Sequence, residues 1–86
     1  MPSTDLKISV LGSGAWGTAL AQLISKKSKV LMWVKEKKVK IDINQNHQNK
    51  KYLPGIKLSK NIVSSNNLED LESSDIIFLT VPVQYM

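Results

Sequence analysis

Three glycines stand within six residues near the start of the chain, at Gly12, Gly14 and Gly17. Glycine is a poor helix former and loses more conformational entropy on folding than any other residue, so this cluster needs a physical reason. The spacing G-x-G-x-x-G suits a backbone that approaches a diphosphate, because no Cβ stands between the main-chain amides and the phosphate oxygens. The glycines therefore predict an anion-binding turn.

The segments around the glycines predict the structural context that such a turn requires. Residues 7–11, KISVL, are a short β-branched run typical of a buried strand. Small and apolar residues at helical spacing predict a helix over 15–27, and the apolar run 29–34 predicts a second strand. A strand, a helix and a strand within about thirty residues form a βαβ unit, whose crossover is right-handed and whose strands are parallel.

Within this unit each glycine has its own predicted role. Gly12 permits the tight turn, Gly14 lets a pyrophosphate approach the backbone, and Gly17 lets the helix pack closely on the strand. We expect bare amides at Gly12 and Gly14, and those of Ala15 and Trp16, to bind the diphosphate with help from the helix dipole. The alternative is a flexible turn that merely enters a helix, and it leaves Gly17 unexplained.

The rest of the chain predicts further alternation of helices and strands. The expected elements are a helix over 37–46, a loop over 47–60 that turns at Pro54-Gly55, a strand over 61–65, a brief helix that Asn67 caps with Asp70 completing a capping-box-like pair, and a central strand over 75–81. The fold class is therefore α/β, a Rossmann-type doubly wound parallel sheet of which only the N-terminal portion is present. We expect residues 1–86 to form a partial dinucleotide-binding domain with an exposed strand edge.

Composition narrows the function classes. The chain has no cysteine, which excludes a disulfide framework and thiolate chemistry. Its net charge of +5 comes from twelve lysines and no arginine, with a cluster at Lys35, Lys37, Lys38 and Lys40. Without arginine forks or interleaved aromatics, this cluster is better explained as a solvated helix face than as a nucleic-acid surface. No stretch predicts a membrane span or a signal peptide, so we expect a cytoplasmic location.

Two questions about cofactor binding stay open: the choice between NAD and NADP, and the place of Trp16. An acid after the second strand would bind the ribose 2′-hydroxyl of NAD, whereas a cation would take the 2′-phosphate of NADP. The chain offers Lys35 followed by Glu36, which tilts the choice toward NADP without deciding it. Trp16, beside the turn, either lines the dinucleotide cleft or belongs to the core.

Several stretches together resemble one enzyme family. They are ISVLGSGAWGTALA, LMWV, NQNHQNKKYLPGIKL and DIIFLTVPVQ, which span nearly the whole chain. In these stretches the chain is similar to the soluble NAD(P)-dependent glycerol-3-phosphate dehydrogenases. A generic dinucleotide-binding protein would share only the first stretch.

The resemblance implies a set of cofactor-binding residues. The pyrophosphate would be held by Gly12, Ser13, Gly14, Ala15, Trp16 and Gly17. Lys35 would lie near the adenosine ribose, and Tyr85 near the ribose on the nicotinamide side. Tyr52, in the KYLPG loop, is a weaker candidate, and the lone His47 is better explained by a structural role than by acid–base catalysis.

The resemblance also implies what this chain lacks. Family members carry their catalytic lysines, their substrate-phosphate contacts and a helical second domain beyond the point that corresponds to Met86. We therefore expect no catalytic residue and no metal site in this chain, and no activity from it alone. In the intact enzyme, hydride would pass between the nicotinamide and a triose phosphate, interconverting dihydroxyacetone phosphate and glycerol 3-phosphate for phospholipid synthesis. The resemblance is also compatible with a homodimer.

Two other functions compete with this one. The first is another dehydrogenase that joins such a domain to a helical partner, for example a 6-phosphogluconate or 3-hydroxyacid dehydrogenase; the KYLPG stretch argues against it. The second is a non-catalytic protein that binds a nucleotide or a partner.

Overall fold

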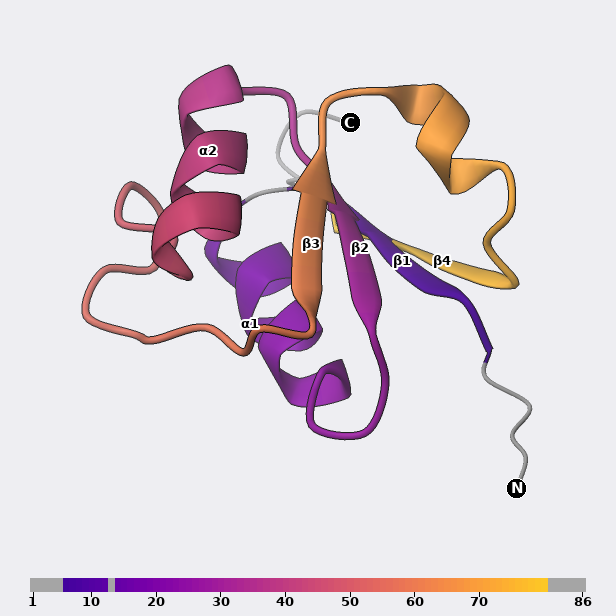
Figure 1. Ribbon diagram of the computed structural model, residues 1–86, viewed down its shortest axis with the longest axis horizontal. Helices are drawn as coiled ribbons and strands as arrows, with labels where there is room; N and C mark the ends of the chain where they lie inside the picture. The colour runs from indigo at the N-terminus through magenta and orange to yellow at the C-terminus, as the bar shows by residue number, and fades with distance from the viewer. Residues whose placement is uncertain (1–5, 13, 81–86) are drawn as a thin grey trace.

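The computed structural model describes residues 6–12 and 14–80, which form an alternating α/β arrangement (Figure 1). The elements are β1 (Ile8–Leu11), α1 (Ala15–Ile24), β2 (Val30–Trp33), α2 (Lys37–Asn46), β3 (Ile62–Ser65), the 3₁₀ helix η1 (Leu68–Leu71) and β4 (Ile76–Leu79). All pairings in the sheet are parallel and the strand order is β3-β2-β1-β4. The predicted α/β fold with a parallel sheet is confirmed.

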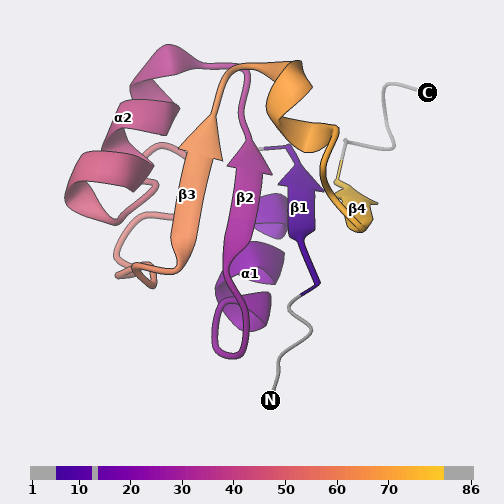
Figure 2. The same ribbon diagram turned by 45° about the vertical axis from the view of Figure 1, so that its right-hand side comes forward.

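One face of the sheet carries the core of the chain. Val10 of β1 pairs with Met32 of β2, and Met32 pairs with Ser64 of β3, so these three side chains point to the same face. Figure 2 shows α1 packed behind this sheet, and α2 lies beside β3. The buried cluster consists of Val10, Ala21, Val30, Met32, Val34, Val39, Ile43, Leu58 and Ile62. Apolar residues from both helices thus close over alternate residues of the strands.

The fourth strand differs from its prediction as a buried central strand. β4 pairs only with β1 among the described residues, and all four of its side chains are exposed. Its apolar run correctly predicts a strand. Such runs are typical of strands that are covered on both faces, whereas both faces of β4 are exposed. Hydrophobicity along one strand does not reveal which neighbours it has, and β4 is the outer strand of the sheet that residues 6–12 and 14–80 form. It supplies the predicted exposed strand edge.

The first helix is shorter than predicted. It ends at Ile24, and residues 25–27 form a turn instead of continuing the helix. The Ser25 hydroxyl donates to the carbonyl oxygen of Gln22 at 2.7 Å. Serine side chains compete in this way with the helical hydrogen-bond pattern, which explains the early end. Neither α1 nor α2, each of 10 residues, is long and apolar enough for a transmembrane helix, and no other helix in the described part of the chain is.

The cap of the short helix η1 is confirmed in part. The side-chain oxygen of Asn67 accepts a hydrogen bond from the backbone amide of Glu69 at 3.0 Å, as predicted. The prediction that Asp70 completes a capping-box-like pair is wrong, because its carboxylate is bound by the hydroxyl of Ser65. That serine stands at the end of β3 and also accepts from the amide of Asn67, so it takes the place of the reciprocal pair.

Candidate dinucleotide-binding site

The glycine turn joins the carboxyl end of β1 to the first turn of α1. Gly12 has φ +132°, a conformation that side chains rarely adopt, and a Cβ there would collide with the hydroxyl of Thr80. A Cβ on Gly17 would lie 2.6 Å from Thr80 Oγ1 and 2.8 Å from the carbonyl oxygen of Gly12. The predicted roles of Gly12 in the turn and of Gly17 in close packing agree with this geometry. The close packing involves Thr80, which follows β4, in addition to the end of β1.

The amide of Gly12 does not face a ligand. It donates to the carbonyl oxygen of Trp33 at 2.9 Å and so continues the pairing of β1 with β2. The expectation of a bare amide at this position is therefore wrong. The sequence motif does not distinguish an amide used by the sheet from one left for a phosphate.

Gly14 has the open surroundings that a bound diphosphate requires. A Cβ built on it meets no heavy atom within 4 Å. It is the N-cap of α1, and no side chain caps that helix. Among the described residues, none accepts a hydrogen bond from the backbone amides of Gly14, Ala15 and Trp16. Such amides at a helix N-terminus form a seat for an anion, and the helix dipole adds to its positive potential.

Trp16 lies in the first turn of α1 and is 85% exposed. This exposure excludes a place in the core of the described chain, which was one of its two predicted roles. A large aromatic ring beside the open amides is instead available to flank a ligand.

A series of hydrogen bonds connects the glycine turn to the loop that follows α2. The hydroxyl of Thr18 donates to the carbonyl oxygen of Gly14 at 2.9 Å, and the side-chain amide of Asn49 donates to that hydroxyl at 2.7 Å. Asn49 is fully buried, and its side-chain oxygen accepts from the backbone amide of Tyr52 at 3.3 Å. The sequence motifs did not indicate Thr18 or Asn49 as part of the site. A threonine in the first turn of a helix was the available signal, because such a hydroxyl readily bonds a carbonyl one turn earlier.

Asp42 fixes the beginning of the same loop. Its carboxylate accepts hydrogen bonds from the side chains of Asn46 and Gln48 and from the backbone amide of Lys50. Partial burial alone would raise the pKa of this carboxyl group, but these hydrogen bonds outweigh it and hold the pKa below its ordinary value. His47 ends α2 in a left-handed conformation, and its carbonyl oxygen accepts from the amide of Leu58 at 2.7 Å. These contacts agree with the predicted structural role of His47.

The two residues expected at the adenosine ribose, Lys35 and Glu36, come one residue after the end of β2. Lys35 is exposed. The carboxylate of Glu36 accepts from the ammonium group of Lys51 through one oxygen and from the hydroxyl of Tyr52 through the other. The bond to Lys51, followed by the bond to Tyr52, holds the pKa of Glu36 below its ordinary value. The two neighbours thus differ: Lys35 is exposed to solvent, whereas the carboxylate of Glu36 is hydrogen-bonded to Lys51 and Tyr52.

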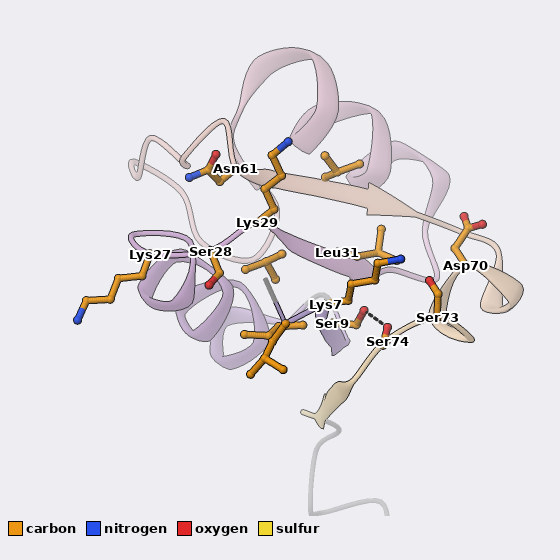
Figure 3. Close-up of a pocket in the computed structure, with 14 residues that line it drawn as sticks. Lys7, Ser9, Lys27, Ser28, Lys29, Leu31, Asn61, Asp70, Ser73 and Ser74 are labelled. Atoms are coloured by element: carbon orange, nitrogen blue, oxygen red, sulfur yellow. Dashed lines mark hydrogen bonds between the residues drawn. The ribbon is translucent and has the colours of Figure 1, made fainter. Parts of the chain in front are cut away.

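A separate hollow of about 540 Å³ lies on the other face of the sheet (Figure 3). The residues that line it include Ser9 of β1 and Leu31 of β2, together with Lys7 and Lys29, which directly precede these strands. These residues stand toward the amino ends of the strands, whereas nucleotides bind beyond the carboxyl ends. The hollow is therefore distinct from the glycine turn.

Two of the predicted site residues, Ser13 and Tyr85, lie outside the described residues. Within the described ranges, no group of three or more His, Cys, Asp or Glu side chains is placed to hold a metal ion.

Comparison with known proteins identifies a family that matches nearly the whole chain. The family described as NAD-dependent glycerol-3-phosphate dehydrogenase N-terminus matches residues 7–86. A glycerol-3-phosphate dehydrogenase [NAD(P)+] from Erythrobacter litoralis is 41% identical over 81 residues, which are 93% of this chain and 24% of that protein. A human glycerol-3-phosphate dehydrogenase 1-like protein is 37% identical, with 100% of this chain and 28% of that protein covered.

Solved structures give the same result. A glycerol-3-phosphate dehydrogenase from Saccharomyces cerevisiae superimposes with a TM-score of 0.86 at 36% identity, over 95% of this chain and 28% of that one. The enzyme from Plasmodium falciparum gives a TM-score of 0.85 at 35% identity, over 94% of this chain and 26% of that one. The chain therefore spans about a quarter of the length of these relatives.

Proposed function

Because the chain belongs to the NAD-dependent glycerol-3-phosphate dehydrogenase N-terminal family, we propose that it binds the pyrophosphate of NAD or NADP at the glycine turn. The open space at Gly14, beside three amides without acceptors among the described residues, is the observation that carries this proposal. A cradle that a Cβ would enter, at the start of a helix, fits a diphosphate.

The proposed binding residues follow from the turn and from the relatives. The pyrophosphate seat is assigned to Gly12, Ser13, Gly14, Ala15, Trp16 and Gly17, in which Gly12 and Gly17 shape the turn and the amides after it bind. Lys35 is assigned to the adenosine ribose because it follows β2 and is exposed. Tyr85 is assigned to the ribose on the nicotinamide side only by the resemblance.

The activity itself is proposed for the longer protein. Relatives named glycerol-3-phosphate dehydrogenase [NAD(P)+] are about four times as long as the matched segment. We propose that residues 1–86 act as part of the dinucleotide-binding domain of such an enzyme, which holds the cofactor while hydride passes to or from a triose phosphate. The substrate groups would come from sequence outside this chain, and a cytoplasmic homodimer is the proposed assembly.

The test is a titration of the purified 86-residue chain with NADH and NADPH. Tryptophan emission is followed because Trp16 is exposed beside the proposed seat. We expect a saturable change with both cofactors and none with adenosine, which lacks phosphates. Gly14→Val should abolish the change while far-UV circular dichroism stays the same, because the new side chain enters the cradle and meets no protein atom at its Cβ. A folded wild-type chain that gives no saturable change contradicts the proposal.

A further inference from the structure

The loop after α2 folds back onto the beginning of that helix through three side chains, Glu36, Lys51 and Tyr52, which we name the Glu36 clamp. Lys51 and Tyr52 each donate to a different oxygen of the Glu36 carboxylate. The ammonium group of Lys51 also lies 5.3 Å from the centroid of the Tyr52 ring, within range of a cation–π contact. The acid therefore has two partners that are themselves in contact.

The clamp is anchored by the interior of the protein. The Tyr52 ring is partly buried and packs against the hydrophobic core. Its backbone amide donates to Asn49, which is fully buried and bonded to Thr18 in the first turn of α1. Because Tyr52 is held from both sides, its hydroxyl is held at Glu36 more firmly than that of a free surface side chain.

The clamp also stands where cofactor type is decided. β2 ends at Trp33, and the residues just beyond this strand of a βαβ unit meet the adenosine 2′-position. A free carboxylate at this place accepts a hydrogen bond from a 2′-hydroxyl and repels a 2′-phosphate, whereas a cation attracts the phosphate. Lys35 and Glu36 are consecutive here, so the preference between the two cofactors depends on which of the two side chains is free to contact the adenosine 2′-group.

We propose that Lys51 and Tyr52 are specificity-determining residues, which favour NADP over NAD by holding the Glu36 carboxylate and leaving Lys35 to meet the adenosine 2′-phosphate. This inference rests on the proposed binding of a dinucleotide. With both carboxylate oxygens engaged, Glu36 is a poorer acceptor for a ribose hydroxyl, and Lys51 offsets its negative charge. The 2′-position would therefore meet Lys35, which is exposed, while the charge of the neighbouring Glu36 is offset mainly by Lys51.

A double-mutant cycle tests the clamp in the purified chain. The dissociation constants of NADPH and NADH are measured by tryptophan emission in wild type, Lys51→Met, Glu36→Gln and the double variant. Lys51→Met should lower the preference for NADPH about fivefold, because it frees one carboxylate oxygen and removes the cation that offsets its charge. The same substitution in the Glu36→Gln background should change the preference less than about twofold.

Two further variants separate the clamp from general charge and from folding. Lys50→Met removes the same charge from the adjacent position. Both the backbone amide and the charge of Lys50 act on Asp42 and not on Glu36, so this substitution should leave the preference unchanged. Tyr52→Phe keeps the ring in the core and removes the hydroxyl, so it should lower the preference by less than Lys51→Met does.

Three results would overturn the role of the Glu36 clamp in cofactor preference. The preference for NADPH could fall equally in Lys50→Met and Lys51→Met, Lys51→Met could lower it equally in the Glu36→Gln background, or Lys51→Met could leave it unchanged. In each of these cases the wild-type chain still binds both cofactors, so the proposed function stands. A folded wild-type chain that binds neither cofactor overturns both proposals.

Discussion

The strands β1 and β2 and the outer strand β4 differ in how completely they are covered. On the side of α1 and α2, Val10, Met32 and Ile43 are fully buried, whereas every residue of β4 is exposed. The glycine turn depends on both regions, because Gly12 and Gly17 belong to β1 and α1 but lie against Thr80, which follows β4. The proposed anion-binding turn therefore packs on the buried core at β1 and α1 and on an exposed strand at β4.

The largest expected effect contrasts two isoleucines, one from each region. Ile43→Ala should lower the free energy of unfolding by about 2–5 kcal/mol, because the side chain is fully buried between α2 and the sheet. Ile77→Ala should cost only about 1 kcal/mol, since this side chain is 44% exposed on β4. Urea unfolding of the two variants measures both values. Equal losses would show that β4 is covered in solution, by self-association for instance, and would remove the contrast.

The second prediction contrasts two glycines of the turn. Gly17→Ala should lower the unfolding free energy by about 1–3 kcal/mol, because its Cβ meets the Gly12 carbonyl oxygen at 2.8 Å. Gly14→Ala should change stability by under about 1 kcal/mol, since its φ of −67° suits alanine and its surroundings are open. Thermal unfolding distinguishes them. A Gly14→Ala chain that is less stable than Gly17→Ala would mean that the cradle is filled by protein.

The glycine pair shows what the sequence could predict and what it could not. Motif spacing together with a flanking strand and helix correctly located the turn, because those requirements are local. The use of the Gly12 amide by the sheet depends on register with β2, and the contact with Thr80 joins residues more than sixty positions apart. Neither can be derived from spacing alone.

The same limit applies to the loop after α2. Its polar composition and Pro54-Gly55 turn correctly predicted the absence of a helix or strand. The buried Asn49 and the engagement of Glu36 depend on how that loop folds back, which local propensity does not determine. An exposed strand edge was predicted, but its place at β4 was not, since a strand's neighbours are a property of topology.

The smallest expected effect is the pH dependence of the loop. The folded-state pKa of Asp42 is lowered, so its stabilisation is present above the ordinary carboxyl pKa of 3.8 and is lost as pH falls through the lower folded value. Stability should therefore fall below about pH 4, by about 1 kcal/mol or less from this group. Urea unfolding at pH 7 and pH 3 measures this loss.

Two variants assign that loss to Asp42. In Asp42→Asn the difference between the two pH values should shrink, because the residue no longer titrates. Glu72→Gln, which changes an exposed acid after η1, should retain the wild-type difference. An Asp42→Asn chain with an unchanged difference would contradict the role of this carboxylate in holding the loop.

The claim that the amides after Gly12 bind a diphosphate is tested most directly by amide chemical shifts. A ¹⁵N-labelled chain is titrated with NADH, and the backbone signals of Gly14, Ala15 and Trp16 are followed. We expect these three signals to move most and to saturate together, with Gly12 moving less because its amide is bonded to Trp33. Unmoved signals there, with the largest changes instead around Lys7 and Lys29 at the opposite hollow, would contradict it.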